Sequence, residues 1–319
     1  MCHSYLTRCA LALGAVIALS ACDDGPTPPL SDPRGVLLVV QGAGRDAEIY
    51  AMRPDGSERR QLTRNTVFDG DPDWSPDGRR IVFVSAQDST PGAPTRRIEI
   101  FVMNANGSGR RRLLEVTDAA YHPRWSPDGG RIAFERYDGD VGQIRPYVMN
   151  SDGSNVHLVT SAPGENFSVE WSPDGTRLLF LSNRAPRNWW TMYVMRADGS
   201  GEQQLAGDGA CPTNVSAPRW SPDGSRIAYT CDAQGGAIYS IRADGTQPTL
   251  LSTPTSAPGT APFFADGGPV WSPDGGQLAF TSRRDGDSHV YVKDMSSGAV
   301  SRLTSDGAGY LVAAWGSAP

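Results

Sequence analysis

The chain has 319 residues and a formal net charge of -6 at neutral pH, with 29 Lys and Arg residues against 35 Asp and Glu residues. Lys293 is its only lysine. This acidic balance argues against a surface that binds nucleic acid, and the length is enough for one large closed domain.

Residues 1–21 are predicted to form a secretion signal. Arg8 is their one charged residue, and it precedes an apolar run, residues 10–19, that is too short to span a membrane comfortably. The Leu-Ser-Ala-Cys sequence at residues 19–22 is similar to a bacterial lipobox, in which Cys22 becomes the lipid-bearing first residue. The alternative is an ordinary cleaved signal beside an unrelated cysteine. Cleavage removes Arg8 and no acidic residue, so the formal charge changes from -6 to -7.

Residues 22–34 are predicted to be the lipidated Cys22 and a proline-rich tether. The sequence from residue 23 reads DDGPTPPLSDPR, whose prolines favour a semi-extended chain. We expect this segment to lie outside the folded domain and to hold it close to a membrane surface. The protein would then be a lipid-anchored component of the bacterial cell envelope, on the periplasmic or outer-membrane face, with the leaflet left open.

From residue 35 onward the chain is a repeat built on Trp-Ser-Pro-Asp-Gly. The pentapeptide begins at Trp74, Trp125, Trp171, Trp220 and Trp271, and a shortened copy begins at Trp315. These tryptophans are 44 to 51 residues apart, which indicates a repeat architecture. Proline presets the first central position of a tight turn, aspartate bonds the local backbone and glycine accepts a positive φ. Each copy therefore predicts a turn.

Each turn is followed by an apolar strand and then by a second recurring sequence of the type Ile-Tyr-Val-Met-Asn-Ala-Asp-Gly-Ser. The Asp-Gly or Asn-Gly centre of this sequence predicts a hairpin between two strands. Each repeat therefore contributes four short antiparallel strands, which we name a to d from the centre outward. Four strands at this period are typical of a β-propeller blade.

The strand count predicts an all-β, six-bladed β-propeller over residues 35–316. The first b strand, residues 35–40, has no tryptophan motif before it, and the last a strand, residues 311–315, has no b strand after it. We expect these two strands to pair in one blade. Such pairing closes the ring and removes the free sheet edges that invite aggregation.

The turn, the strand behind it and the hairpin resemble the PD40 repeats of the TolB-like, WD40-like bacterial β-propellers. The resemblance covers nearly all of residues 35–316 and implies the fold, whereas propellers host many unrelated activities. TolB resembles a two-domain periplasmic protein with an α/β domain ahead of its propeller, and no such domain fits this sequence. We therefore do not extend the resemblance to TolB's partners, the Pal lipoprotein and the Tol membrane proteins.

Propeller connectivity sorts the loops onto two faces. The a–b and c–d turns share one face, which we call the uniform face because its turns are short and nearly identical. The b–c and d–a loops share the other, the varied face, where the differences in length collect. Binding is expected at the varied face and the mouth of the central channel. Its loops are residues 86–97, 137–143, 183–190, 207–216, 253–267 and 283–288.

Aromatic and arginine side chains distinguish one loop of the varied face. Trp189 and Trp190 follow Arg184 and Arg187, a composition that is typical of interface hot spots and suited to stacking on sugars. Side chains alternate along a strand, so in the alternative interpretation one of the two tryptophans packs between blades.

Three further residues of the varied face are weaker candidates. Phe263 and Phe264 form an aromatic pair in another long loop. His122, at the entry to an a strand, lies nearest the channel mouth, although a lone histidine is more often a structural neighbour than a base. The sequence contains no Gly-x-Ser-x-Gly or His-Glu-x-x-His motif, so a catalytic site would have to assemble from several blades.

Asp-Gly-Asp triplets are the candidates for a calcium site. Their carboxylates belong to Asp69, Asp71, Asp138, Asp140, Asp285 and Asp287. No triplet extends to the full calcium-loop spacing with its distal glutamate. Because turn chemistry accounts for Asp-Gly, we expect no metal and no cofactor.

Two cysteines, Cys211 and Cys231, remain beyond the lipobox. Cys231 ends a b strand, and Cys211 lies just before the a strand of the same blade, so both belong to one face. In an oxidising envelope we expect a disulfide between them, which would stabilise the fold by about 3 kcal/mol.

Two functions follow as hypotheses. The first is a monomeric envelope lipoprotein, without chemistry of its own, that binds an unidentified envelope protein. The second is a propeller that binds or cleaves a glycan at the channel mouth. An aromatic rim with a plugged channel would favour the first, and a ring of basic and acidic groups around a polar channel would favour the second.

Overall fold

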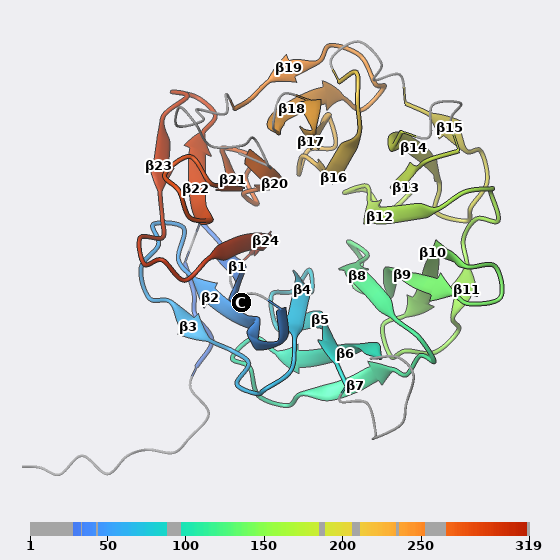
Figure 1. Ribbon diagram of the computed structural model, residues 1–319, viewed down its shortest axis with the longest axis horizontal. Helices are drawn as coiled ribbons and strands as arrows, with labels where there is room; N and C mark the ends of the chain where they lie inside the picture. Colours follow the sequence, from blue (N-terminus) through green and yellow to red (C-terminus); the bar gives the residue numbers. More distant parts are fainter. Residues whose placement is uncertain are drawn as a thin grey trace, which may run out of the picture.

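A computed structural model describes residues 28–317, except residues 33, 43, 88–96, 185–188, 206–210, 234–235 and 253–265. Six four-stranded antiparallel sheets stand around a central axis (Figure 1). The predicted all-β, six-bladed propeller is therefore confirmed. Within the described residues, no helix has the length and apolar character needed to cross a membrane.

Each blade runs from strand a at the axis to strand d at the rim. Blade 1 contains β24 (Tyr310–Gly316), β1 (Val36–Gln41), β2 (Glu48–Met52) and β3 (Arg60–Gln61), with the 3-10 helix η1 (Gly44–Asp46) between β1 and β2. Blade 2 contains β4 (Asp69–Trp74), β5 (Arg80–Ala86), β6 (Ile98–Asn104) and β7 (Arg111–Leu114). Blade 3 contains β8 (Ala120–Trp125), β9 (Arg131–Asp138), β10 (Gln143–Asn150) and β11 (His157–Leu158).

The other three blades repeat this plan. Blade 4 contains β12 (Asn166–Trp171), β13 (Arg177–Ser182), β14 (Thr191–Arg196) and β15 (Gln203–Gln204). Blade 5 contains β16 (Val215–Trp220), β17 (Arg226–Cys231), β18 (Ala237–Arg242) and β19 (Thr249–Leu250). Blade 6 contains β20 (Asp266–Trp271), β21 (Gln277–Ser282), β22 (His289–Asp294) and β23 (Val300–Arg302).

The ring closes as the sequence predicts, between the last strand and the first. β24 pairs antiparallel with β1, so that Leu37 lies opposite Trp315 and Val40 opposite Leu311. Across this blade, the indole of Trp315 donates a hydrogen bond to the carbonyl of Arg34 at 2.9 Å. Segments from the two ends of the propeller thus form one sheet.

The central part of strand b is apolar in each blade because neighbouring strands and blades cover both of its faces. In β13, every residue after Arg177 is buried. A ring on strand b faces a ring on strand c in five blades, which explains the aromatic residue that recurs there. These pairs are Phe83–Phe101, Phe134–Tyr147, Phe180–Tyr193, Tyr229–Tyr239 and Phe280–Tyr291, with centroids 5.8 to 6.0 Å apart.

The Trp-Ser-Pro-Asp-Gly segments form tight a–b turns, as predicted. In the first, the Ser75 hydroxyl donates to Asp77 at 2.6 Å and accepts the Arg80 N–H at 2.9 Å, while Gly78 has a φ of +67°. The same serine, aspartate and glycine geometry recurs in the other four copies. The local sequence therefore determines these turns without help from the rest of the fold.

The tryptophan before each turn joins neighbouring blades. Each is 4 to 8 % exposed, and an arginine that begins strand b of the preceding blade stacks on three of them. The guanidinium of Arg131, for example, lies 4.5 Å from the ring centroid of Trp171. The equivalent pairs are Arg80 with Trp125 and Arg177 with Trp220.

The segment before β1 differs from the expectation of a free tether. Leu30 is 4 % exposed and belongs to the apolar cluster that contains Val36 and Trp74. Asp32 is buried and pairs with Arg34 at 3.0 Å. The proline-rich composition does not predict this contact. One buried leucine is enough to dock a short segment on the fold. The predicted signal peptide and Cys22 lie outside the described residues.

Candidate functional site

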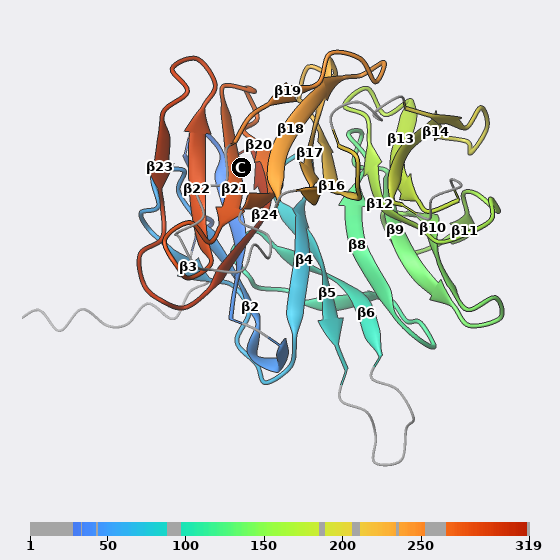
Figure 2. The ribbon, with the colours of Figure 1, turned by 45° about the horizontal axis from the view of Figure 1, so that its top comes forward.

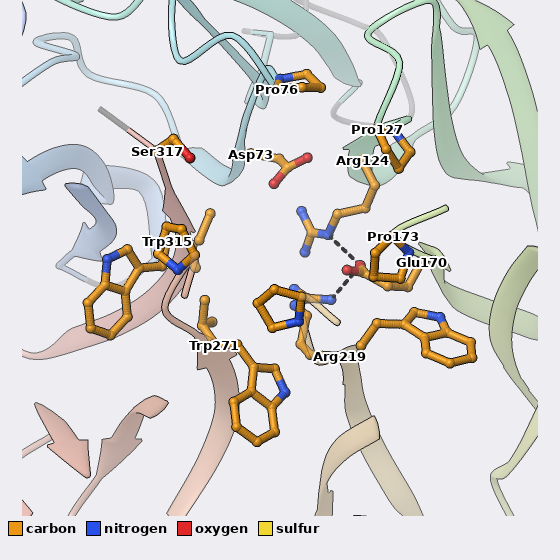
Figure 3. A pocket seen from close by; sticks show the side chains of 16 residues that line it. Asp73, Pro76, Arg124, Pro127, Glu170, Pro173, Arg219, Trp271, Trp315 and Ser317 are labelled. Carbon is orange, nitrogen blue, oxygen red and sulfur yellow. Dashed lines mark hydrogen bonds and ion pairs between the residues drawn. The ribbon is translucent and has the colours of Figure 1, made fainter. Parts of the chain in front are cut away.

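The residue before each tryptophan faces the central channel. Strand side chains alternate, so when the tryptophan packs between blades its predecessor points to the axis. These six residues are Asp73, Arg124, Glu170, Arg219, Val270 and Ala314. All six line a cavity of about 370 Å³ that also reaches the prolines of the uniform face (Figure 3). We call the four charged ones the charged belt.

The charged belt is an ion-pair network on one wall of the channel. Arg219 donates to Oε2 of Glu170 at 3.1 Å, and Nε of Arg124 lies 3.5 Å from the same oxygen (Figure 3). Asp73 accepts the Trp125 N–H at 2.9 Å, which ties blade 2 to blade 3. Two guanidinium groups thus share one carboxylate oxygen.

Burial shifts the pKa values of the side chains in the charged belt. It raises the pKa of Glu170 and of Asp73, although the two arginines act in the opposite direction. The pKa of Arg219 is lowered, first by burial and next by the like charge of Arg124. The wall opposite is apolar, because Val270 and Ala314 occupy the equivalent positions there. The channel therefore has one charged wall and one apolar wall.

A bulge in each innermost strand shapes the varied end of the channel. The bulged residue has a positive φ in five strands, namely Asp71, His122, Ser168, Ala217 and Gly268. The bulge removes backbone N–H groups from strand pairing, and side chains of the preceding blade accept hydrogen bonds from them. Glu135 accepts the Val169 N–H at 2.8 Å, and Thr281 accepts that of Val312 at 3.0 Å. The bulged residues line a second cavity of about 170 Å³.

His122 lies in this second cavity between two carboxylates. Its Nδ1 is 2.6 Å from Oε2 of the buried Glu135, and its Nε2 is 3.7 Å from Oδ2 of Asp71. Desolvation lowers the pKa of His122, but the two carboxylates outweigh it and raise the pKa to about 9. His122 is thus protonated at neutral pH, with 39 % of its side chain exposed. A protonated imidazole is not available as a general base.

The predicted arginine and tryptophan patch is largely structural where the chain is described. Arg184 pairs with Glu202 at 2.6 Å and lies 4.2 Å from the ring centroid of Tyr193. Trp190 packs edge-on against Phe167 of the same blade, with centroids 4.3 Å apart. It also packs against an apolar cluster of blades 4 and 5, which fits the alternative in which a tryptophan packs between blades. Trp189 beside it is half-buried. Arg187, Phe263 and Phe264 lie outside the described residues.

The aspartates of the Asp-Gly-Asp triplets have separate environments. Asp69 is fully buried, where it accepts from Asn65 at 2.6 Å and faces Arg110 at 3.5 Å. Asp138 faces Arg145 at 3.5 Å, and Asp285 faces Arg302 at 3.2 Å. Asp71 faces His122, while Asp140 and Asp287 are exposed. Among the described residues, no three His, Cys, Asp or Glu side chains converge to hold a metal ion.

Cys211 and Cys231 meet at the varied face of blade 5. Their sulfur atoms are 2.07 Å apart, and their Cα atoms 5.6 Å. The bond connects the d–a loop with the end of β17. Both cysteines belong to the apolar cluster that includes Trp220.

The charged belt is the feature that reasoning from the sequence missed. Its signal is present: aligning the repeats on their tryptophans shows Asp, Arg, Glu, Arg, Val and Ala at the preceding position. The tryptophan does not change among the repeats, whereas this neighbour does. The alternation of a strand then directs the variable residue to the axis.

The family follows from a match over most of the chain. The model of the TolB beta propeller domain, PD40, matches residues 88–267 and 209–318. The chain belongs to the TolB β-propeller family. A solved TolB from Acinetobacter baumannii superposes with a TM-score of 0.74, at 19 % identity, over 91 % of this chain and 69 % of that one. The family resemblance predicted from the repeats is confirmed.

Individual TolB-family relatives match shorter parts of the chain. The Tol-Pal system protein TolB of Alcanivorax borkumensis is 31 % identical over 100 residues, which are 30 % of this chain and 22 % of that protein. An oligogalacturonate lyase in complex with manganese shares the fold, with a TM-score of 0.56, 17 % identity and coverage of 78 % and 71 %. Other curated relatives are named peptidases. The chain spans 30 % or less of the curated relatives that it matches.

Proposed function

We propose that this protein is an envelope lipoprotein that binds a protein partner through the varied face and has no chemistry of its own. The observation that carries the proposal is an exposed apolar residue on the rim of the varied mouth of the channel. Leu311 lines the cavity at this mouth, whereas Tyr121 and Phe167 at the equivalent strand positions are partly buried. Leu311 is 54 % exposed, the largest exposed fraction among the large apolar side chains described. Exposed apolar groups beside a cavity favour a macromolecular partner.

Three arguments support an envelope location. The sequence at residues 19–22 resembles a lipobox, and several acyl chains on Cys22 would anchor the protein stably. The family relative of Alcanivorax borkumensis is named for the Tol-Pal system, which agrees with an envelope protein. A disulfide between Cys211 and Cys231 fits an oxidising compartment.

The chemistry of the channel supports a binding role over a catalytic one. His122 is protonated at neutral pH and so cannot accept a proton from a substrate. Glu170 is engaged by two arginines. The relatives named as peptidases match over 71 to 112 residues, at most 16 % of each of those proteins.

The proposal is tested by chemical crosslinking in intact envelopes, followed by mass spectrometry. We compare the native protein with Leu311→Asp on the rim and with Val300→Asp on the outer strand β23, where the valine is 42 % exposed. One protein should be captured, lost in Leu311→Asp and kept in Val300→Asp. Equal capture by both variants would contradict binding at the varied face.

A second function, binding of an acidic glycan, is favoured by the charged belt itself. The channel is open and carries both basic and acidic groups, and sugar hydroxyls can pair with either. Calorimetric titration with an oligogalacturonate and with a neutral gluco-oligosaccharide separates the two functions. Saturable binding of the oligogalacturonate alone, abolished in Arg219→Gln, would support the glycan. Absence of binding would remove this candidate.

A further inference from the structure

We infer that the propeller rests on anionic phospholipid headgroups through the edge where its N-terminal segment joins the fold. We define this anchor edge by Arg60, Arg64 and Arg111, around Pro28. The inference rests on the proposed lipid at Cys22. It adds which surface of the propeller faces the membrane.

The N-terminal segment enters the fold at a hollow that arginines line. The guanidinium of Arg60 donates to the Pro28 carbonyl at 2.9 Å, and Leu30 is buried directly behind it. A cavity of about 300 Å³ lies at this point, and its lining includes Arg59, Arg60 and Arg64. Arg59 is engaged by Asp306 at 2.8 Å and Arg60 by Glu58 at 3.2 Å, so Arg64 is the arginine of this hollow left to meet a ligand.

Arg111 extends this basic surface to blade 2. The turn of blade 2 lines the same hollow through Ala105 and Asn106, and β7 begins with Arg111 just beyond that turn. Arg64 and Arg111 are both exposed, and within the described residues neither side chain makes a hydrogen bond or an ion pair. Arg64 is therefore available on this edge, and so is Arg111, whose charge also helps to lower the pKa of the exposed Asp152 carboxyl in blade 3.

The acidic residue next to the hollow is already neutralised. Glu58 pairs with Arg53 at 2.6 Å and with Arg60 at 3.2 Å. The outer strands of blades 3, 4 and 5, by contrast, contain no arginine: they are β11, β15 and β19. The basic charge of the rim is thus concentrated where the chain would leave for the membrane.

The number of residues between Cys22 and Pro28 limits the distance between the anchor edge and the membrane. Pro28 is six residues after Cys22. An extended chain advances at most about 3.5 Å per residue, so the hollow lies within about 20 Å of the lipid-bearing residue. Screening at physiological salt acts over about 8 Å, so only the nearest surface interacts with the headgroups. Since the mature chain is acidic overall, an anionic membrane favours the orientation in which the basic edge faces it.

The hollow lies at the outer rim, where segments of both faces meet. Asn106 belongs to a c–d turn of the uniform face, whereas Arg64 follows β3 in a d–a segment. Gly107 in the c–d turn packs on Leu62, where an added Cβ would lie 2.6 Å from the leucine carbonyl. Leu311 at the varied mouth of the channel does not line this hollow.

The test uses the mature chain with Cys22→Ser, so that only the propeller surface contacts lipid. Its sedimentation with phosphatidylcholine vesicles is compared with that on vesicles containing equal parts of phosphatidylglycerol, at low and high salt. We expect binding to the anionic vesicles alone, and its loss at high salt. Arg64→Glu/Arg111→Glu should reduce it about tenfold or more, because each basic group near an anionic surface contributes to binding.

A charge-matched variant separates the anchor edge from net charge. Arg242→Glu/Arg283→Glu changes the charge equally, at two exposed arginines in blades 5 and 6. This variant should bind anionic vesicles as well as the parent. Equal loss in both variants, or binding without phosphatidylglycerol, would overturn the inference. Metabolic labelling of the wild type with palmitate tests the lipid at Cys22 independently. The result distinguishes an absent lipid at Cys22 from an anchor edge that does not bind phospholipid.

Discussion

The two faces of this propeller use the same strands for opposite purposes. On the innermost strands, a tryptophan is buried between blades in every blade, and five of the six lead into the same Ser-Pro-Asp-Gly turn. The residue directly before it differs from blade to blade and faces the channel. The tryptophan position maintains the packing between blades, and the position before it is where the channel-facing side chain differs from blade to blade. A single step along a β-strand, which reverses the direction of the side chain, separates the two roles.

The tilted view in Figure 2 shows the innermost strands β4, β8 and β12 running side by side from one face to the other. The bulges in these strands lie toward the varied face, and the Trp-Ser-Pro-Asp-Gly turns at the uniform face. Substitutions of the buried tryptophans should therefore affect stability, whereas substitutions of exposed side chains at the varied mouth should affect binding.

The largest effect is expected for Trp171→Ala. This indole is 4 % exposed and lies under Arg131, so its removal leaves a cavity between blades 3 and 4. Loss of a buried tryptophan costs about 3 to 5 kcal/mol in free energy of unfolding. Denaturant unfolding measures it, with Trp189→Ala as the control at the varied face. If Trp189→Ala destabilises as much, the division between the faces is wrong.

A comparable effect is expected for Arg284→Ala. Its guanidinium makes two hydrogen bonds, at 2.9 and 2.8 Å, to the fully buried carboxylate of Asp266. Removing one partner of a buried pair leaves an uncompensated charge and costs about 3 kcal/mol. Arg283→Ala, at the exposed neighbour, should change the free energy of unfolding little. Similar values for the two variants would contradict a structural role for Arg284.

The disulfide should contribute about as much as the Arg284 pair. Reduction of Cys211–Cys231 is expected to lower the free energy of unfolding by about 3 kcal/mol, because the bond restricts the unfolded chain. Thiol titration of the unfolded, unreduced mature protein should find neither cysteine reactive. Two reactive thiols would show that the bond does not form in the native protein.

The smallest effect is expected from the pH dependence of His122. Its pKa of about 9 exceeds the ordinary value of 6.5, so its stabilising contribution is complete below pH 6.5 and is lost as the pH rises through 9. The unfolding free energy at pH 6 and at pH 9.5 should therefore differ more in the wild type than in His122→Gln. Equal differences in the two proteins would mean that His122 does not carry this shift.

The fold was predictable from the sequence because local chemistry determines it. Pro, Asp and Gly select the turn at each Trp-Ser-Pro-Asp-Gly segment, and the unpaired strands at the two ends of the repeat predicted the closure of blade 1. The pairing of β24 with β1 follows from that count, whereas its register, with Leu37 opposite Trp315, does not. The docking of Leu30 did not, because its proline-rich neighbours favour a tether.

The candidate site was less predictable because it depends on contacts between blades. His122 is flanked by Asp71 from the previous blade and by Glu135 from the adjacent strand, and no spacing in the sequence connects these three residues. A proline follows the bulged residue in four innermost strands, including Pro123 after His122, but this signal does not show which side chains the bulge brings together. The charged belt, by contrast, could be found by aligning the repeats.

The most direct test of the division between the faces is site-specific photo-crosslinking in intact envelopes. A photoreactive amino acid replaces Leu311 at the varied mouth or Pro222 at the uniform face, both of which are exposed and line the channel cavities. A discrete protein adduct is predicted from position 311 and none from position 222. An adduct from position 222 alone, or identical adducts from both positions, would contradict the assignment of binding to the varied face.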